Sequence, residues 1–205
     1  MATNTRKRNG DERRRELCDA AIAVLAEHGS RGLTHGRVDR SAGVPEGTTS
    51  YYYRTREALL RGVAKRIAEI DVANLQSVID APLDPLSPFA LLAELTLMQA
   101  HGPGLMLNRA RHELLLGAVR DPDLAATSQA FATRINAMAR EAIAHLQPST
   151  DAPALLDAQT TAVNTFIAGV FTRLVGGDRA INNAEQLAGL LEAVATAVSL
   201  QTQRT

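Results

Sequence analysis

The sequence has few residues with which to build a covalent or aromatic scaffold. Its 205 residues include one cysteine, Cys18, so a single chain can form neither a disulfide nor a cysteine-built metal site. Cys18 falls among the turns of an expected helix, where a cysteine usually acts as a small buried hydrophobic residue. Aromatic residues make up 3% of the chain, which argues against a ligand pocket built mainly on aromatic stacking.

Targeting signals and catalytic motifs are also missing. The polar N-terminal segment lacks the apolar run of a secretion signal, and apolar runs break well short of the ~20 residues that span a bilayer. We therefore expect a soluble, cytoplasmic protein with no membrane partner. The five histidines are scattered, and there is no H-E-x-x-H, glycine-rich phosphate loop or G-x-S-x-G. Neither an enzyme nor a metal or cofactor site is predicted.

The charge is balanced overall but unevenly distributed. Residues 1–66 hold 14 Lys and Arg against 8 Asp and Glu, whereas residues 67–205 hold 8 against 14. A basic first third on an acidic body predicts that the first third meets a polyanion. Hydrophobic residues make up 45%, which is enough for a packed core.

Helical periodicity dominates the chain, so we expect an all-α fold of about nine helices. Gly29 and the Gly102-Pro103-Gly104 cluster are expected to interrupt helices. Residues 89–100 are apolar on every side, which predicts a buried, central helix. The expected N-caps are Thr34, Ser87, Asp121, Thr55 and Asn183. The expected helices cover about residues 12–29, 35–42, 45–51, 56–79, 88–100, 105–120, 123–146, 154–175 and 184 to near the C-terminus.

Residues 32–60 carry the most informative pattern. Two short helices joined by a tight turn at Gly43 are typical of a helix-turn-helix. The second helix is short and polar, as a helix that enters the ~12 Å wide major groove must be. Gly47 would let its backbone approach DNA closely.

This segment resembles the TetR family of transcriptional regulators over nearly thirty residues. The matching residues are Gly32-Leu33-Thr34, Gly43-Val44, Gly47-Thr48, Tyr52-Tyr53 and Arg56-Glu57-Ala58-Leu59. Two positions depart from the family pattern: Ser50 replaces a common tyrosine, and Gly36 replaces a longer side chain. The remaining chain resembles the family only in being helical, in its length and in its two long apolar C-terminal helices.

The resemblance implies a DNA-binding domain over residues 1–60, with a basic tail at 1–11. An effector-binding and dimerisation domain over 61–205 would follow, linked through the helix at 56–79. Tyr52 and Tyr53 are also compatible with packing between helices, and packing is the role expected of Tyr53. The basic tail is compatible with either a minor-groove arm or a solvated segment. The predicted DNA-contacting residues are Thr34, His35, Arg37, Pro45, Glu46, Gly47, Thr48, Thr49, Ser50, Tyr51, Tyr52, Thr55 and Arg56.

Polar residues recur on otherwise apolar helices of the larger domain. Each one alone is compatible with a helix-to-helix hydrogen bond. Together with methionine and phenylalanine they predict an apolar effector cavity with a few polar anchors. The predicted effector-binding residues are Met98, His101, Met106, Asn108, His112, Phe131, Met138, Asn164 and Phe166.

The last two helices carry apolar stripes that need covering by a core or by a partner. The predicted homodimer interface comprises Phe166, Val170, Leu187, Leu191, Val194 and Val198. The resemblance implies a repressor that binds a palindromic double-stranded DNA operator at the nucleoid and leaves it when a small-molecule effector binds. The alternative is a nucleoid-associated or scaffold protein with a helix-turn-helix and no small-molecule ligand.

Overall fold

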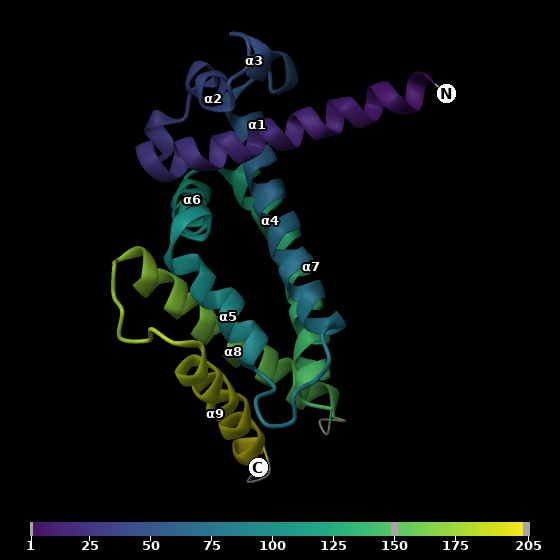
Figure 1. Ribbon diagram of the computed structural model, residues 1–205, viewed down its shortest axis with the longest axis vertical. Helices are drawn as coiled ribbons and strands as arrows, with labels where there is room; N and C mark the ends of the chain where they lie inside the picture. The colour runs from purple at the N-terminus through teal and green to yellow at the C-terminus, as the bar shows by residue number, and fades with distance from the viewer. Residues whose placement is uncertain (1, 149–151, 203–205) are drawn as a thin grey trace. The chain divides into compact units, whose positions relative to one another are not determined.

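The computed structural model describes residues 2–148 and 152–202, and within these ranges every regular element is a helix (Figure 1). The all-α prediction is confirmed. The elements are α1 (Ala2–Gly32), α2 (His35–Ala42), α3 (Thr48–Tyr52), α4 (Arg56–Asp80), α5 (Ala90–Leu97), the 3-10 turn η1 (Met98–Ala100), α6 (Gly102–Ala118), α7 (Pro122–Leu146), α8 (Pro153–Val175) and α9 (Ala184–Thr202).

α1 begins at Ala2, ten residues before the predicted start, so the segment expected as a tail is helical from residue 2 onward. Lys and Arg are good helix formers, and one glycine such as Gly10 weakens a helix by only about 1 kcal/mol. The predicted break at Gly29 is confirmed, since its φ of 65° and ψ of 179° lie outside the helical region.

Two other helix starts were predicted wrongly, for opposite reasons. α3 begins at Thr48 and not at Pro45, because Gly47 adopts a left-handed φ of 89° that no helix can pass through. A break is present, because His101 is extended, but α6 begins at Gly102 and not at Leu105, so that the Gly102-Pro103-Gly104 cluster forms its first turn. Proline is tolerated in a first turn because its missing N–H would have had no partner there.

The chain forms two compact units. The first contains Met1–Glu69 and Met106–Phe131, and the second contains Ile70–Leu105 and Ala132–Thr205. The chain passes from one unit to the other within α4, near the start of α6 and within α7. The functional boundary predicted at residue 60 remains a prediction.

The first unit is built around the contacts of α1 with α2 and of α2 with α3. Leu17 and Leu25 of α1 are fully buried together with Val38 of α2. Thr34 caps α2 as predicted, since its hydroxyl accepts a hydrogen bond from the Arg37 N–H at 3.3 Å. The short helices are thus fixed by a core and a cap, because isolated helices of this length are not stable in water.

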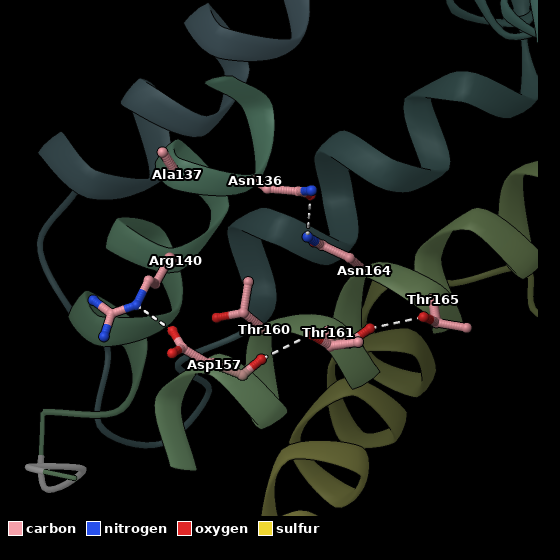
Figure 2. A pocket seen from close by; sticks show the side chains of 8 residues that line it. All are labelled: Asn136, Ala137, Arg140, Asp157, Thr160, Thr161, Asn164 and Thr165. Carbon is pink, nitrogen blue, oxygen red and sulfur yellow. Dashed lines mark hydrogen bonds and ion pairs between the residues drawn. The ribbon is translucent and has the colours of Figure 1, made fainter. Parts of the chain in front are cut away.

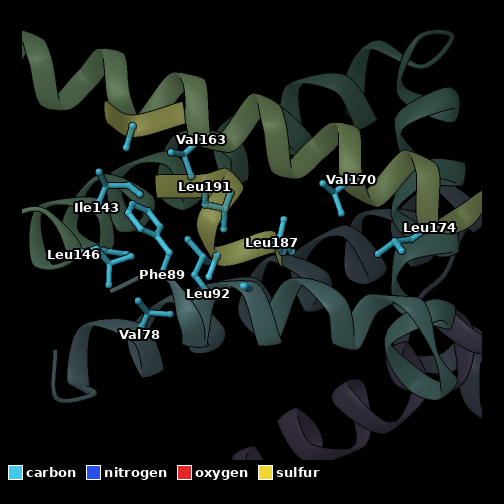
Figure 3. Packing of buried hydrophobic residues seen from close by; sticks show 14 of the residues in the cluster. Val78, Phe89, Leu92, Ile143, Leu146, Val163, Val170, Leu174, Leu187 and Leu191 are labelled. Atoms are coloured by element: carbon cyan, nitrogen blue, oxygen red, sulfur yellow. The ribbon is translucent and has the colours of Figure 1, made fainter. Parts of the chain in front are cut away.

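The second unit has its core where α5, α8 and α9 pack together (Figure 3). Leu187 and Leu191 lie one helical turn apart on α9 and are fully buried among Phe89, Val163 and other apolar residues. α5 contributes Leu92 and Ala93 to this core, which matches its predicted central position. None of the helices in the described ranges is long and apolar enough to cross a membrane.

Candidate functional site

The second helix of the helix-turn-helix is anchored by one buried carboxylate. Asp39 of α2 is 2% exposed and accepts three hydrogen bonds from α3 and the turn before it. The Gly47 N–H donates at 2.8 Å, the Thr49 N–H at 2.7 Å and the Thr49 hydroxyl at 2.5 Å. Asp39 therefore caps α3 from outside its own helix and satisfies N–H groups that a helix start leaves without partners.

Two opposing effects act on the pKa of Asp39. Burial alone would raise this pKa, because it disfavours the charged carboxylate. The hydrogen bonds from Thr49 and Gly47 favour the charged form, and they outweigh burial. The pKa of Asp39 is lowered from its ordinary value of 3.8, so the carboxylate is charged at neutral pH.

Thr49 is fully buried, so its hydroxyl cannot serve a base edge as the sequence led us to expect. Sequence reasoning also missed Asp39, which reads as an ordinary polar residue of a short helix. An acidic residue eight positions before a glycine that starts a polar helix is the only signal that the sequence offers for this contact.

The outer face of α3 is open to solvent. Tyr51 is 75% exposed, and Ser50 and Gly47 are also exposed. The ring of Tyr51 meets the ring of Tyr52 edge to face, with 5.1 Å between the centroids. Thr48 is half-buried, and its hydroxyl donates to the Pro45 carbonyl at 2.6 Å. Pro45 and Glu46 are exposed in the turn before the helix.

The start of α2 lies beside the end of α3. The Nε2 atom of half-buried His35 lies 2.7 Å from the Tyr53 carbonyl oxygen, so this nitrogen is held by the protein. Thr34 and Arg37 are exposed. Arg40 and Arg54 are exposed as well and were missed, although Arg40 follows Arg37 by one helical turn on α2. All three arginines therefore present positive charge beside the helix-turn-helix.

Arg56 at the start of α4 was predicted to bind phosphate, but the structure gives its guanidinium another partner. One nitrogen donates to both the carbonyl and the hydroxyl of Ser30, the latter at 2.7 Å. The Ser30 N–H donates to the Glu113 carboxylate of α6 at 2.7 Å. Ser30 therefore joins α4 and α6 to the end of α1. Thr55 caps α4 as predicted, since its hydroxyl accepts from the Ala58 N–H at 3.1 Å.

Tyr52 and Tyr53 pack beside α1, which agrees with the interpretation that they fill the space between helices. The Tyr53 hydroxyl lies 3.0 Å from the Cys18 sulfur, and the Arg14 guanidinium lies over both rings. Burial raises the pKa of the Cys18 thiol and of the Tyr53 hydroxyl. Both groups are protonated at neutral pH, and Cys18 has the packing role expected of it.

The predicted effector-binding residues are divided between the two units. Met106, Asn108, His112 and Phe131 belong to the first unit. Met98, His101, Met138, Asn164 and Phe166 belong to the second unit. Met98 is 64% exposed and His101 is exposed, whereas Asn108 is fully buried. His112 is half-buried, with its Nδ1 atom 2.9 Å from the Asn108 carbonyl oxygen.

The second unit has a groove of about 440 Å³ between α7 and α8 (Figure 2). Of the predicted effector residues only Asn164 lines it, and its amide donates to the Asn136 side chain at 3.3 Å. Figure 2 shows Arg140 paired with Asp157 across the same groove. The remaining lining residues are Ala137, Thr160, Thr161 and Thr165. Most residues that line this groove are polar or charged, whereas the sequence predicted a mainly apolar cavity.

Three of the predicted dimer residues belong to the core of the chain itself. Val170, Leu187 and Leu191 are at most 3% exposed, so they have no surface left to offer a partner (Figure 3). Phe166, Val194 and Val198 are half-buried. An apolar stripe on a helix predicts that something covers it, and here the core of the second unit does so.

No group of three or more His, Cys, Asp or Glu side chains that could hold a metal ion occurs in the part of the chain that the structure describes.

Known proteins resemble this chain in fold more than in sequence. No family model and no curated protein matches it. A TetR-family member from Streptomyces coelicolor is 25% identical, with a TM-score of 0.64, and the match covers 89% of this chain and 98% of that one. The multidrug binding protein EbrR, solved with ethidium, is 22% identical with a TM-score of 0.60, over 89% of this chain and 98% of that one.

A candidate transcriptional regulator from Saccharomonospora viridis, solved with choline, is 16% identical with a TM-score of 0.70. The match covers 89% of this chain and 95% of that one. The chain therefore has the fold of the TetR-family transcriptional regulators, the family that its residues 32–60 resemble.

Proposed function

We propose that this protein is a sequence-specific DNA-binding transcriptional regulator, a repressor released from its operator by a small molecule. One observation carries the proposal. Asp39 anchors α3 from the inside, which leaves Gly47, Ser50 and Tyr51 on an open outer face. A short helix fixed on one side and polar on the other suits the major groove.

The positive charge of the helix-turn-helix supports a polyanionic partner. Arg37, Arg40 and Arg54 are exposed, and none forms an ion pair with another described residue. Charges of this kind bind phosphates and position the protein on the duplex, whereas base contacts supply the sequence preference. A regulator acts where its DNA is, so the proposal includes a cytoplasmic protein that is nucleoid-associated when bound.

A homodimer on a palindrome is part of the proposal. α8 and α9 each expose a face of small residues, which allow helices to approach closely. Thr161, Thr165 and Gly169 lie on α8, and Gly189 and Ala193 lie on α9. We propose these faces, edged by half-buried Val194 and Val198, as the contact between protomers. Two copies would place their α3 helices ~34–36 Å apart, one turn of DNA.

The small-molecule effector is proposed by analogy of fold. EbrR and the Saccharomonospora viridis protein were solved with ethidium and choline, and each has this fold. α4 runs from the first unit into the second, and Ser30 links its start to Glu113 of α6. A ligand that moves α4 or α6 would reach the helix-turn-helix by this route. By linkage DNA must weaken effector binding by the same factor. We propose no catalytic activity.

The test begins with selection of bound duplexes from a randomised library, followed by gel-shift titration of the selected site. We expect a palindrome, and we expect Tyr51→Ala to weaken it by ~1–3 kcal/mol. Arg37→Ala should weaken specific and random duplexes alike, whereas Arg134→Ala, an exposed arginine of α7, is the matched control. Enrichment of no sequence would favour the nucleoid-associated alternative. A selected palindrome that no compound of a thermal-shift screen releases would count against the effector.

A further inference from the structure

A basic groove in the first unit has no role in the function proposed above. It has a volume of about 490 Å³ and lies between the middle of α1, the first half of α4 and the start of α7. It is separate from the outer face of α3. All of its lining residues belong to the first unit, so the groove is defined by that unit alone.

Cations outnumber anions along its walls. Arg14, Arg15, Arg61, Lys65 and Arg66 line the groove, together with two carboxylates, Asp11 and Glu69. Arg15, Lys65 and Arg66 all approach the Glu69 carboxylate, at 3.7, 3.9 and 3.7 Å. One carboxylate cannot neutralise three cations, and such long contacts between half-exposed groups are weak.

Two cations of the groove, Arg61 and Lys65, are the most available to bind an anion. Arg66 is already held by Asp19 outside the groove, through hydrogen bonds of 2.7 and 3.2 Å. Arg61 forms no ion pair with any described residue, and Lys65 has only its long contact with Glu69. A concave surface with unneutralised cations concentrates anions.

The groove also has an aromatic and apolar wall. The Tyr53 ring packs directly on Gly62, where a Cβ atom would lie only 2.6 Å from the ring carbon Cε1. Phe131 and Cys18 complete this wall. Cations beside an aromatic and apolar wall suit an organic anion with a flat apolar body better than they suit a bare inorganic ion.

We propose that this groove binds a small organic anion, with its acidic group on Arg61 and Lys65 and its flat apolar body against Phe131 and the part of the Tyr53 side chain that lines the groove. Arg14 links the groove to the helix-turn-helix, because its guanidinium donates to the Tyr52 carbonyl at 2.9 Å. An anion that draws Arg14 toward itself competes with this bond at the end of α3.

The test uses the full chain and two fluorescent probes that differ in charge. Anilinonaphthalenesulfonate carries a flat apolar body and a sulfonate, and N-phenylnaphthylamine has the same body without the charge. In Arg61→Gln/Lys65→Gln we expect the sulfonate to bind roughly tenfold more weakly, since charge-assisted hydrogen bonds are lost. The neutral probe should bind as it does to the wild type. Arg109→Gln/Arg134→Gln removes two exposed arginines outside the groove and should change neither probe.

Two results would overturn the proposal. The first is a double groove variant, folded by circular dichroism, that binds the sulfonate as tightly as the wild type. The second concerns duplex DNA, the other polyanion near this unit. If random duplex displaced the sulfonate and the same variant weakened duplex binding by the same factor, the groove would be a DNA backbone contact. Neither result depends on whether an operator or an effector exists.

Discussion

The Asp39→Asn variant tests how the helix-turn-helix is held together. Its amide has the shape of the carboxylate, and its oxygen can still accept from the N–H and hydroxyl of Thr49. The amide nitrogen, however, would face the Gly47 N–H, so that a donor meets a donor. Hydrogen bonds to charged groups contribute about 1.5–3 kcal/mol each, and relief from burying the charge offsets part of that loss. We expect the variant to lose about 1–2 kcal/mol in the free energy of unfolding, and Asp39→Ala about 3 kcal/mol.

The chain supplies its own probe for this measurement. It has no tryptophan and three tyrosines, all at positions 51–53 at the end of α3. Tyrosine emission during denaturant unfolding therefore reports on this helix, while far-UV circular dichroism reports on all helices. Glu27→Gln removes a carboxylate that is 63% exposed and is the matched control. An Asp39→Asn protein whose tyrosine transition coincides with that of the wild type would show that the carboxylate does not anchor α3.

Acid should have the same effect as the substitution. The pKa of Asp39 is lower in the folded protein than its ordinary 3.8, so its contribution to stability is fully present above about pH 4. The contribution is lost as the pH falls below 3.8 and through the lowered folded value, because the unfolded chain takes up a proton on this carboxylate while the folded protein still holds it charged. In the wild type the transition seen by tyrosine emission should move to lower denaturant concentration as the pH falls through this window. Asp39→Asn should lack that part of the pH dependence, and an unchanged profile would contradict the assignment.

Three further predictions distinguish residues that stabilise the fold from residues that contact DNA or a second protomer. Thr49→Val should lower the free energy of unfolding by about 1 kcal/mol through its lost hydroxyl bond, whereas Tyr51→Ala should leave the stability unchanged and weaken operator binding. Arg56→Ala should destabilise the first unit by about 1–3 kcal/mol and leave the salt slope of DNA binding unchanged; a slope lower by about one would restore its phosphate role. Leu191→Arg should unfold the chain, since this side chain is fully buried, while Ala193→Arg should yield a folded monomer by light scattering.

Local signals in the sequence predicted the helices and most of their ends. Thr34 and Asn183 cap the helices they precede, and Gly29 interrupts α1, because each acts through atoms within a few residues. The predicted helix boundary was wrong where the backbone conformation of a single residue determines the start of the helix. Gly47 turns left-handed before α3, and glycine in a sequence is compatible with either hand.

The contacts of the candidate site were harder to predict, because they join distant residues. Arg56 and Ser30 are 26 positions apart, and Glu113 follows Ser30 by 83, so no local pattern signals that they meet. The apolar stripe that contains Leu187 and Leu191 shows a second limit of prediction from sequence. Its periodicity identifies an apolar face but does not say whether the protein's own core or a second copy covers it.

The separation of α3 into a buried supporting side and an exposed side has an evolutionary consequence. Asp39 and Thr49 hold the helix from beneath, while Ser50 and Tyr51 face outward. Their side chains have one hydrogen bond, from Ser50 to the Gly47 carbonyl, and one edge-to-face ring contact, between Tyr51 and Tyr52. If α3 reads bases as proposed, substitutions at the two outward positions would alter which bases are preferred without loosening the helix. The two inner positions should change only together, as a pair that exchanges donor and acceptor. Under the same proposal, a lineage that carries this arrangement would acquire new target sequences by single substitutions, each of which leaves a folded protein.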